Sequence, residues 1–293
     1  MRMTRRSALR SFLSAALLAP TAGCTVASAT RSPGVPTAVP LRYGPDPSQV
    51  LDLHLPAGTS RSLPVVVVIH GGYWSDAYGK DLGDPLAVDL ANRGYAAVNI
   101  EYRRLGSGGG WPATLTDVAA AIDSLDTVVR PAAHDRLDLT RVVALGHSAG
   151  GQLAVWAAAR PGFPSSAPGS GPKVRLRAAI SQAGVVDLIT GAHQQLGGGA
   201  VQALLGGSPE AVPERYTLAS PSERIPVGVP ISLVHGDIDS IVPIEQSERY
   251  AAKAQAAGDK VTFVKVSDAD HFAMINPKTP AWQRCVEQLG RLI

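Results

Sequence analysis

The segment from Val142 to Leu153 reads VVALGHSAGGQL, and its pattern decides the fold. Apolar residues typical of a buried strand are followed by a Gly-x-Ser-x-Gly pentapeptide and then by residues typical of a helix. A sharp turn between the two elements presents the Ser148 hydroxyl outward if Gly146 and Gly150 remove the crowding that a Cβ atom would cause. The helix directs its first free N–H groups, beginning at Ala149, towards that hydroxyl. The segment predicts a nucleophilic serine, and the alternative is a packing turn lined by glycine.

Outside this segment the chain alternates strand-like and helix-like patterns. The β-branched run Val65–Ile69 predicts a strand buried on both faces of a parallel sheet, and residues 50–55 alternate as in a half-buried strand. The stretch from Val185 to Gly228 interrupts the alternation and is a candidate cap. Together these patterns predict a three-layer α/β fold with a mostly parallel sheet of about eight strands. Further strands are expected at residues 95–100, 141–145, 176–181, 230–235 and 261–266, and helices at 85–93, 115–129, 151–159, 244–257 and 282–292.

A glycine-rich turn follows the β-branched strand. The sequence from His70 to Trp74 is HGGYW, which places two glycines where a backbone comes close to another group. An oxyanion formed at the serine needs two or more N–H donors. We expect these donors to be the amides of Gly72, Tyr73 and Ala149, with a simple β-turn as the alternative.

Two tryptophans are candidates for the walls of a substrate pocket. Trp74 adjoins the glycine-rich turn, and Trp111 precedes the helix expected at residues 115–129. Packing in the core is the competing interpretation for both.

An acid and a base follow two later strands. Asp237 and Asp239 come after the strand at residues 230–235, and His271 is the histidine beyond the last expected strand. Carboxyl ends of parallel strands meet at one edge of the sheet, so Ser148, Asp239 and His271 are expected to lie together. Asp239 is the preferred acid because it lies further from the strand end, and Asp237 is the reserve.

These motifs make the chain from about residue 41 to 293 resemble the α/β-hydrolase superfamily. HGGYW and GHSAG look like the group that contains hormone-sensitive lipases, kynurenine formamidases and feruloyl esterases, although Tyr73 departs from the third glycine of the lipase motif. The resemblance implies that Ser148, His271 and Asp239 cleave carboxylic esters of small or medium acyl chains through an acyl-enzyme, without a metal or other cofactor. The alternatives are an amide or formamide hydrolase, an aminopeptidase-like activity, or a surface lipoprotein that only binds ligands.

Charge gives no support to nucleic-acid binding. The chain has 27 basic and 24 acidic residues, but four of the basic residues precede Cys24, so 23 remain against 24 acidic residues. Phosphate binding requires clustered, uncompensated Lys and Arg. The expected partner is therefore a small ester or amide, and the sequence does not indicate an oligomeric state.

The N-terminus has the pattern of an export signal. A basic start and a short apolar run precede Thr21-Ala22-Gly23, and Arg5-Arg6 resembles a twin-arginine signal. Ala22-Gly23-Cys24 resembles a lipobox, which implies a lipid on Cys24 and a location on the outer face of the membrane, or secretion without the lipid. We therefore expect a signal at residues 1–23, a flexible tether at 24–40 and a catalytic domain at 41–293. Cys285 is the only other cysteine and is expected to be a buried structural thiol.

Overall fold

The computed structural model describes residues 38–293, which contain an eight-stranded sheet. The predicted signal and Cys24 lie outside the described residues, as does most of the predicted tether. The first strand begins at Val39, two residues before the expected start of the domain. None of the helices within residues 38–293 is both long and apolar enough to cross a membrane.

The sheet is mostly parallel, as the sequence predicts. Its strand order is β1-β2-β4-β3-β5-β6-β7-β8, and only the pairs β1–β2 and β2–β4 are antiparallel. The first five strands are β1 Val39–Arg42, β2 Val50–His54, β3 Leu63–Ile69, β4 Ala96–Ile100 and β5 Leu137–His147. The remaining strands are β6 Ala178–Gln182, β7 Ile231–Gly236 and β8 Val261–Val266.

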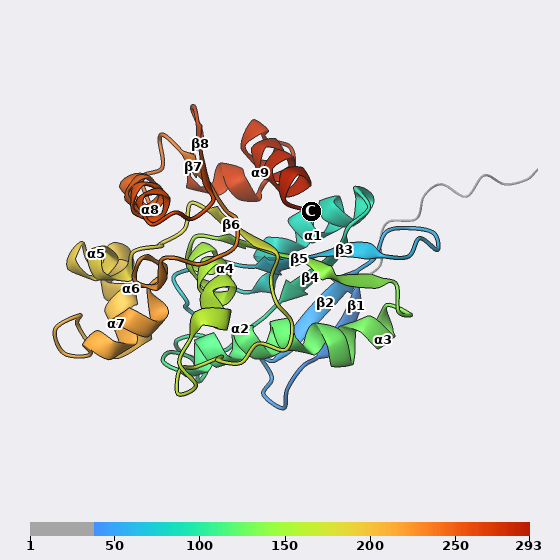
Figure 1. Cartoon of the computed structure of the whole chain (residues 1–293), viewed down its shortest axis with the longest axis horizontal. Helices are drawn as coiled ribbons and strands as arrows, with labels where there is room; N and C mark the ends of the chain where they lie inside the picture. Colours follow the sequence, from blue (N-terminus) through green and yellow to red (C-terminus); the bar gives the residue numbers. More distant parts are fainter. Residues whose placement is uncertain (1–37) are drawn as a thin grey trace, which may run out of the picture. The chain divides into compact units, whose positions relative to one another are not determined.

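Helices cover both faces of this sheet and make three layers (Figure 1). Along β3, Val65, Val67 and Ile69 face one hydrophobic core, whereas Val66 and Val68 face the other. The first core is closed by α2 (Ala113–Ser124), α4 (Ala149–Ala159) and α8 (Glu245–Ala256), and the second by α1 (Asp84–Asn92) and α9 (Pro280–Leu292). The short helices are η1 Lys80–Gly83, η2 Leu125–Val129, α3 Arg130–Ala132, η3 Arg160–Gly162 and η5 His271–Ile275.

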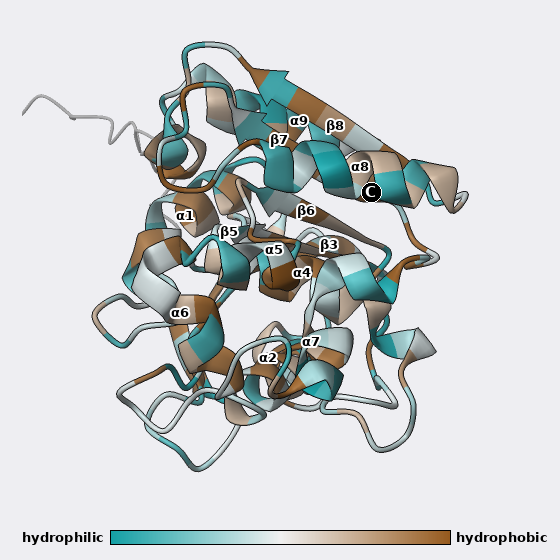
Figure 2. Cartoon of the chain, turned by 90° about the vertical axis from the view of Figure 1, so that its left-hand side faces the viewer, coloured by the Kyte–Doolittle hydropathy of each residue, from teal (hydrophilic) through white to brown (hydrophobic). Residues whose placement is uncertain are grey.

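Helix α4 lies inside the molecule, and α8 lies at its surface. Every residue of α4 is buried, and Figure 2 colours this helix largely as hydrophobic. Helix α8 is amphipathic and shows hydrophilic residues on its outer side in the same view. The position of α4 in the core fixes Ser148, which immediately precedes it.

The structure corrects the expectation for β2. Its alternating pattern predicts one exposed face, but Asp52 is only 9% exposed and His54 only 3%. Strand β2 lies between β1 and β4, and η1 brings the Lys80 ammonium into an ion pair with the Asp52 carboxylate. Pairing with Lys80 allows the charge of Asp52 to be buried. It does not account for His54, whose two ring nitrogens have no hydrogen-bond partner within residues 38–293.

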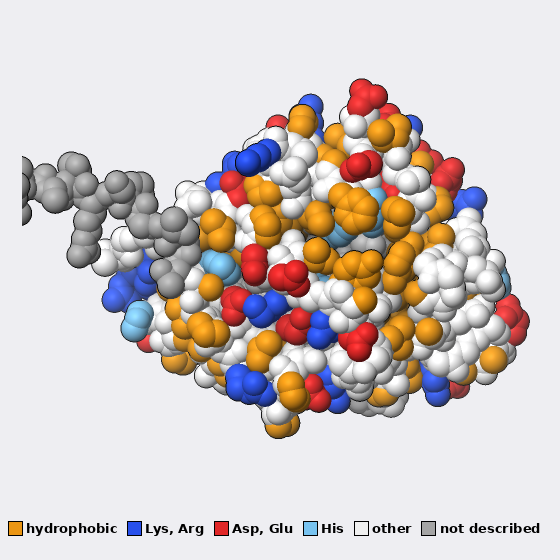
Figure 3. Space-filling model, turned by 180° about the vertical axis from the view of Figure 1, so that it is seen from behind, with side chains coloured by type: hydrophobic (Ala, Val, Ile, Leu, Met, Phe, Trp, Pro, Cys, Tyr) orange, Lys and Arg blue, Asp and Glu red, His pale blue; other side chains and the backbone are white. Residues whose placement is uncertain are grey.

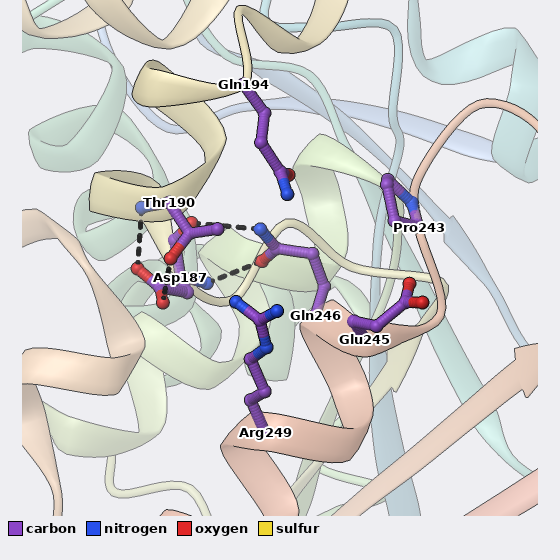
Figure 4. Close-up of a pocket in the computed structure, with 7 residues that line it drawn as sticks. All are labelled: Asp187, Thr190, Gln194, Pro243, Glu245, Gln246 and Arg249. Carbon is purple, nitrogen blue, oxygen red and sulfur yellow. Dashed lines mark hydrogen bonds between the residues drawn. The ribbon is translucent and has the colours of Figure 1, made fainter.

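The expected cap lies between β6 and β7 and is more helical than predicted. It contains α5 Leu188–His193, α6 Leu196–Leu205, α7 Pro213–Ala219 and η4 Pro221–Arg224. Gly197, Gly198 and Gly199 all have positive φ, so the regular part of α6 begins near Ala200. Figure 4 shows how the cap is attached: the Gln246 side chain of α8 bonds the main-chain N–H and C=O of Asp187 at 2.8 and 3.1 Å.

Candidate active site

Ser148 occupies a strained turn between β5 and α4. Its φ of 55° and ψ of −119° are unusual for a residue with a side chain, and such strain is typical of functional sites. A Cβ at Gly146 would lie 2.0 Å from the carbonyl oxygen of Gly150, and a Cβ at Gly150 would lie 2.1 Å from that of Ile69. Both glycines are therefore required by sterics, as the motif predicts.

The glycine-rich turn leaves backbone amides free beside this serine. Gly72 and Tyr73 follow β3 with φ values of 106° and 51°, and their N–H groups have no acceptor among residues 38–293. Ala149 is the first residue of α4, so the helix itself supplies no acceptor for its N–H. The arrangement leaves all three predicted oxyanion donors available.

A buried pair supports the turn from behind. His70 Nε2 lies 2.8 Å from Glu101 Oε1, and His70 Nδ1 lies 2.7 Å from the carbonyl oxygen of Gly71. The Tyr102 hydroxyl donates to the carbonyl oxygen of His70 at 2.9 Å, and the two rings stack. The pair holds the start of the HGGYW segment in place and lies outside the cavity that contains Ser148.

The structure brings Asp239 and His271 together. His271 Nδ1 lies 2.7 Å from Asp239 Oδ2, and both side chains are buried. Asp239 Oδ1 accepts the main-chain N–H groups of Ile241 and Val242 at 2.8 and 2.9 Å. Burial alone would raise the pKa of the Asp239 carboxyl, but hydrogen bonds from His235, His271 and Val242 outweigh it and hold the pKa well below its usual range. Asp239 therefore remains a carboxylate at neutral pH and fixes the ring of His271.

Asp237, the reserve candidate, has a different partner. Its Oδ1 accepts the main-chain N–H of Asp268 at 2.8 Å and ties together the loops that follow β7 and β8. It is Asp239 that lies against the histidine.

Sequence reasoning missed two supporting histidines. His235 Nε2 lies 3.2 Å from Asp239 Oδ2, and its Nδ1 lies 2.8 Å from the Ser247 hydroxyl. His147 Nε2 donates to the carbonyl oxygen of His271 at 2.9 Å, and the two rings are 4.6 Å apart. Burial lowers the pKa of His147 to about 3, so this imidazole is neutral at neutral pH. The sequence signals are weak: His235 ends a predicted strand, and His147 occupies the variable position before Ser148 in the pentapeptide.

One cavity of about 150 Å³ connects these parts. It is lined by Gly72, Tyr73, His147, Ser148 and His271, together with the apolar side chains of Tyr78, Leu82, Ile241, Phe272 and Ile275. Tyr73 also packs against the cap, because a Cβ at Gly197 would come within 2.5 Å of its ring. Ser148, His271 and the turn of Gly72 and Tyr73 thus border a single, mainly apolar space, whereas Asp239 lies against His271 without lining it.

The two predicted tryptophan walls lie elsewhere. Trp74 is completely buried, and its indole N–H donates to Gln152 Oε1 at 3.1 Å. Trp111 packs against the same core, and neither residue lines the cavity of Ser148. Core packing, the competing interpretation, describes both residues.

A possible metal-binding cluster and a cysteine thiol lie outside this cavity. Asp52, His54 and Asp84 are the residues within 38–293 grouped closely enough to hold a metal, but the Lys80 ammonium already contacts Asp52 there. Cys285 is buried on α9, where Gln182 donates to its sulfur at 3.2 Å. Burial raises the pKa of this thiol to about 12, which fits the predicted structural role.

Comparison with known proteins shows which family and fold this chain resembles. Residues 51–254 match the model of the BD-FAE family. The kynurenine formamidase of Danio rerio is 28% identical over 249 residues, which are 82% of this chain and 76% of that protein. Esterase LipC of Mycobacterium tuberculosis H37Rv is 26% identical, over 78% of this chain and 58% of LipC. A truncated carbohydrate esterase from gut microbiota superposes with a TM-score of 0.73 at 23% identity, over 87% of this chain and 96% of that one. This likeness identifies the fold as that of α/β-hydrolases.

Proposed function

Because the chain belongs to the BD-FAE family, we propose that it is a serine hydrolase that cleaves carboxylic esters of small or medium acyl chains. The family and the esterase relatives indicate a hydrolase acting on esters. The observation that carries the finer proposal is the 2.7 Å contact between Asp239 and His271 beside the cavity that Ser148 lines.

In the proposed acylation step, His271 takes the hydroxyl proton of Ser148 as the oxygen attacks the ester carbonyl. The carbonyl oxygen becomes negative, and the amides of Gly72, Tyr73 and Ala149 are the donors that stabilise it. Asp239 stabilises the imidazolium of His271. His271 then gives the proton to the leaving alcohol, and the acyl group stays on Ser148.

Water completes the cycle by the same route. His271 takes a proton from water as its oxygen attacks the acyl-enzyme, and the proton returns to the Ser148 oxygen when the acid leaves. The cavity of about 150 Å³ lies beside Ser148 and has a mainly apolar lining. Its limited size supports a small or medium acyl group.

The proposal is tested by labelling the full chain with a fluorophosphonate probe and by assaying p-nitrophenyl esters. We expect one label per chain, located by mass spectrometry at Ser148, and ester turnover that falls at least 10³-fold in Ser148→Ala. A folded wild-type protein that neither takes the label nor cleaves any ester would overturn the proposal.

A formamide is the second candidate substrate, because a kynurenine formamidase is among the relatives. A formyl group needs little of the acyl cavity, and the leaving amine would take its proton from His271 in the same way. We expect Ser148→Ala to abolish cleavage of an aryl formamide and of an ester together. The ratio of kcat/KM values for a formanilide and the matched phenyl formate decides which substrate class is preferred.

We further propose that residues 1–23 direct export and that Cys24 carries a lipid. Four arginines before Cys24, with no acidic residue among them, and the Ala22-Gly23-Cys24 pattern support this proposal. Fractionation of cells expressing the full chain and its Cys24→Ala variant tests it. We expect the wild type in the membrane fraction and the variant in the medium or the soluble fraction; membrane association of both would contradict lipidation.

A further inference from the structure

Exposed apolar side chains gather around the candidate active site. Within residues 38–293, five large hydrophobic residues are exposed: Val39 (38%), Tyr78 (49%), Ile238 (58%), Ile241 (37%) and Phe272 (59%). All except Val39 border the cavity of Ser148 or the groove beside it. Figure 3 shows one such gathering of hydrophobic side chains around histidine atoms. Contiguous exposed apolar surface commonly marks a ligand-binding site.

The groove is distinct from the catalytic cavity and adjoins it. It encloses about 350 Å³ of open space, and Phe272 lines both spaces. Its apolar side is formed by Ile238, Phe272 and Ala273, and the rest of its lining is polar: Asp268, Asp270, Asn276 and Thr279. Ile238 directly precedes Asp239, and Phe272 directly follows His271, so the groove lies on the acid–base side of the site. The cavity, in contrast, includes the oxyanion turn at Gly72 and Tyr73.

This placement determines which part of an ester reaches the groove. The carbonyl oxygen must point to the amides of the turn, and the leaving oxygen must lie within reach of His271, which protonates it. The substituent on the leaving oxygen therefore extends past Phe272. We propose that the groove bounded by Ile238, Phe272 and Ala273 binds the apolar alkyl group of the leaving alcohol, while the cavity accepts the short acyl group. This inference rests on the ester hydrolase function proposed above.

The charged side chains that line the groove are compatible with an uncharged leaving alcohol. Asp268 and Asp270 also line the groove, and no Lys, Arg or His does so in the described part of the chain. Asp270 Oδ1 already accepts the main-chain N–H groups of Phe272 and Ala273 at 3.1 and 2.9 Å. The two carboxylates disfavour an anionic alcohol, whereas a neutral alkyl group meets no repulsion and can contact the side chains of Ile238 and Phe272.

The test compares two series of esters with purified full-length protein. The alcohol series is methyl, butyl and hexyl acetate, and the acyl series is the methyl esters of acetic, butyric and octanoic acids. The longer alkanols differ little in acidity, so their rates report binding more than leaving-group chemistry. We expect kcat/KM to rise about twofold for each added methylene of the alcohol, which corresponds to partial burial. In the acyl series we expect kcat/KM to stop rising before octanoate, because the cavity is small.

Two variants separate the groove from general surface effects. Ile238→Ser is chosen because Ile238 lines the groove but not the cavity, and we expect it to lower the hexyl-to-methyl ratio of kcat/KM about threefold, mainly through KM. Val39→Ser is the matched control, because it removes an exposed hydrophobic residue of β1 that lines neither space. We expect this control to leave every ratio unchanged.

The outcomes distinguish this inference from the proposed function. Hydrolysis with a flat alcohol series, or a gain that Ile238→Ser leaves intact, would overturn the assignment of the groove. If kcat/KM rises with chain length in the acyl series and not in the alcohol series, the groove binds the acyl group, and the proposed assignment of the groove is also overturned. If no ester of either series is cleaved, the ester hydrolase proposal itself fails.

Discussion

Replacing Asp239 with Asn isolates the role of one carboxylate oxygen. In the structure Asp239 Oδ1 accepts two main-chain N–H groups, and Oδ2 faces His271 Nδ1 at 2.7 Å. The side-chain oxygen of Asn can keep the two main-chain bonds, so the loop should stay folded. Its amide N–H₂ then faces His271 Nδ1 and favours the tautomer that has its proton on Nε2. In that tautomer His271 cannot take the proton of Ser148.

The expected loss is about 10⁴-fold in kcat, the size reported for this substitution in a serine protease triad. At about 1.36 kcal/mol for each tenfold change, this loss corresponds to about 5.5 kcal/mol of transition-state stabilisation. The assay is hydrolysis of p-nitrophenyl acetate at pH 7.5 under single-turnover and steady-state conditions. Circular dichroism and thermal unfolding of the same samples check that the variant is folded.

Asp237→Asn supplies a matched control from the same loop. Asp237 Oδ1 accepts the N–H of Asp268, and an Asn oxygen can accept the same bond. We expect this variant to lose less than about threefold in kcat, because it does not face the histidine. A folded Asp239→Asn variant that keeps more than a tenth of wild-type kcat, or a larger loss in Asp237→Asn, would refute the assignment of the acid.

Three further substitutions test the framework of the site. Gly150→Ala places a Cβ 2.1 Å from the carbonyl oxygen of Ile69, so we expect a loss of about 3 kcal/mol or more in the free energy of unfolding, measured with urea. Burial lowers the pKa of His147 to about 3, so between about pH 6.5 and 3 the unfolded chain binds more protons than the folded chain. The free energy of unfolding of the wild type therefore decreases as the pH is lowered through that window. His147→Gln should shrink the difference in unfolding free energy between pH 7 and pH 5 by about 1–2 kcal/mol, and an unchanged difference would contradict the shift. Glu101→Gln removes the carboxylate that faces His70 at 2.8 Å, and we expect about 3 kcal/mol of destabilisation together with a lower kcat; unchanged thermal unfolding would show that the pair does not support the turn.

The parts of the site that sequence could predict depend on local rules. Gly146 and Gly150 are required by contacts within a single turn, and the pentapeptide between a strand and a helix already implies those contacts. The parallel sheet follows from the apolar run of β3 and the alternation around it. Asp239 and His271 could be placed together because both follow strands whose carboxyl ends share one edge.

The missed and mistaken residues depend on contacts between distant segments. His147 bonds a carbonyl 124 positions away, and no pattern near His147 indicates that partner. Trp74 can be completely buried in the core because Gln152, 78 positions away, accepts its indole N–H. Asp52 is buried because Lys80 arrives from another element. Such partners become visible only when the chain is folded.

The attachment of the cap at Asp187 has a consequence for how this protein can diversify. Gln246 holds the main-chain N–H and C=O of that residue, so the attachment does not require a particular side chain at position 187. The far end of the cap is held in the same way, because Gln152 and Trp156 of α4 donate to the carbonyl oxygens of Ala219 and Leu218 at 2.9 Å. Because both attachments use main-chain atoms of the cap, its side chains are freer to vary than its end points, and a cap grafted from a relative should retain glycine at position 197 beneath Tyr73.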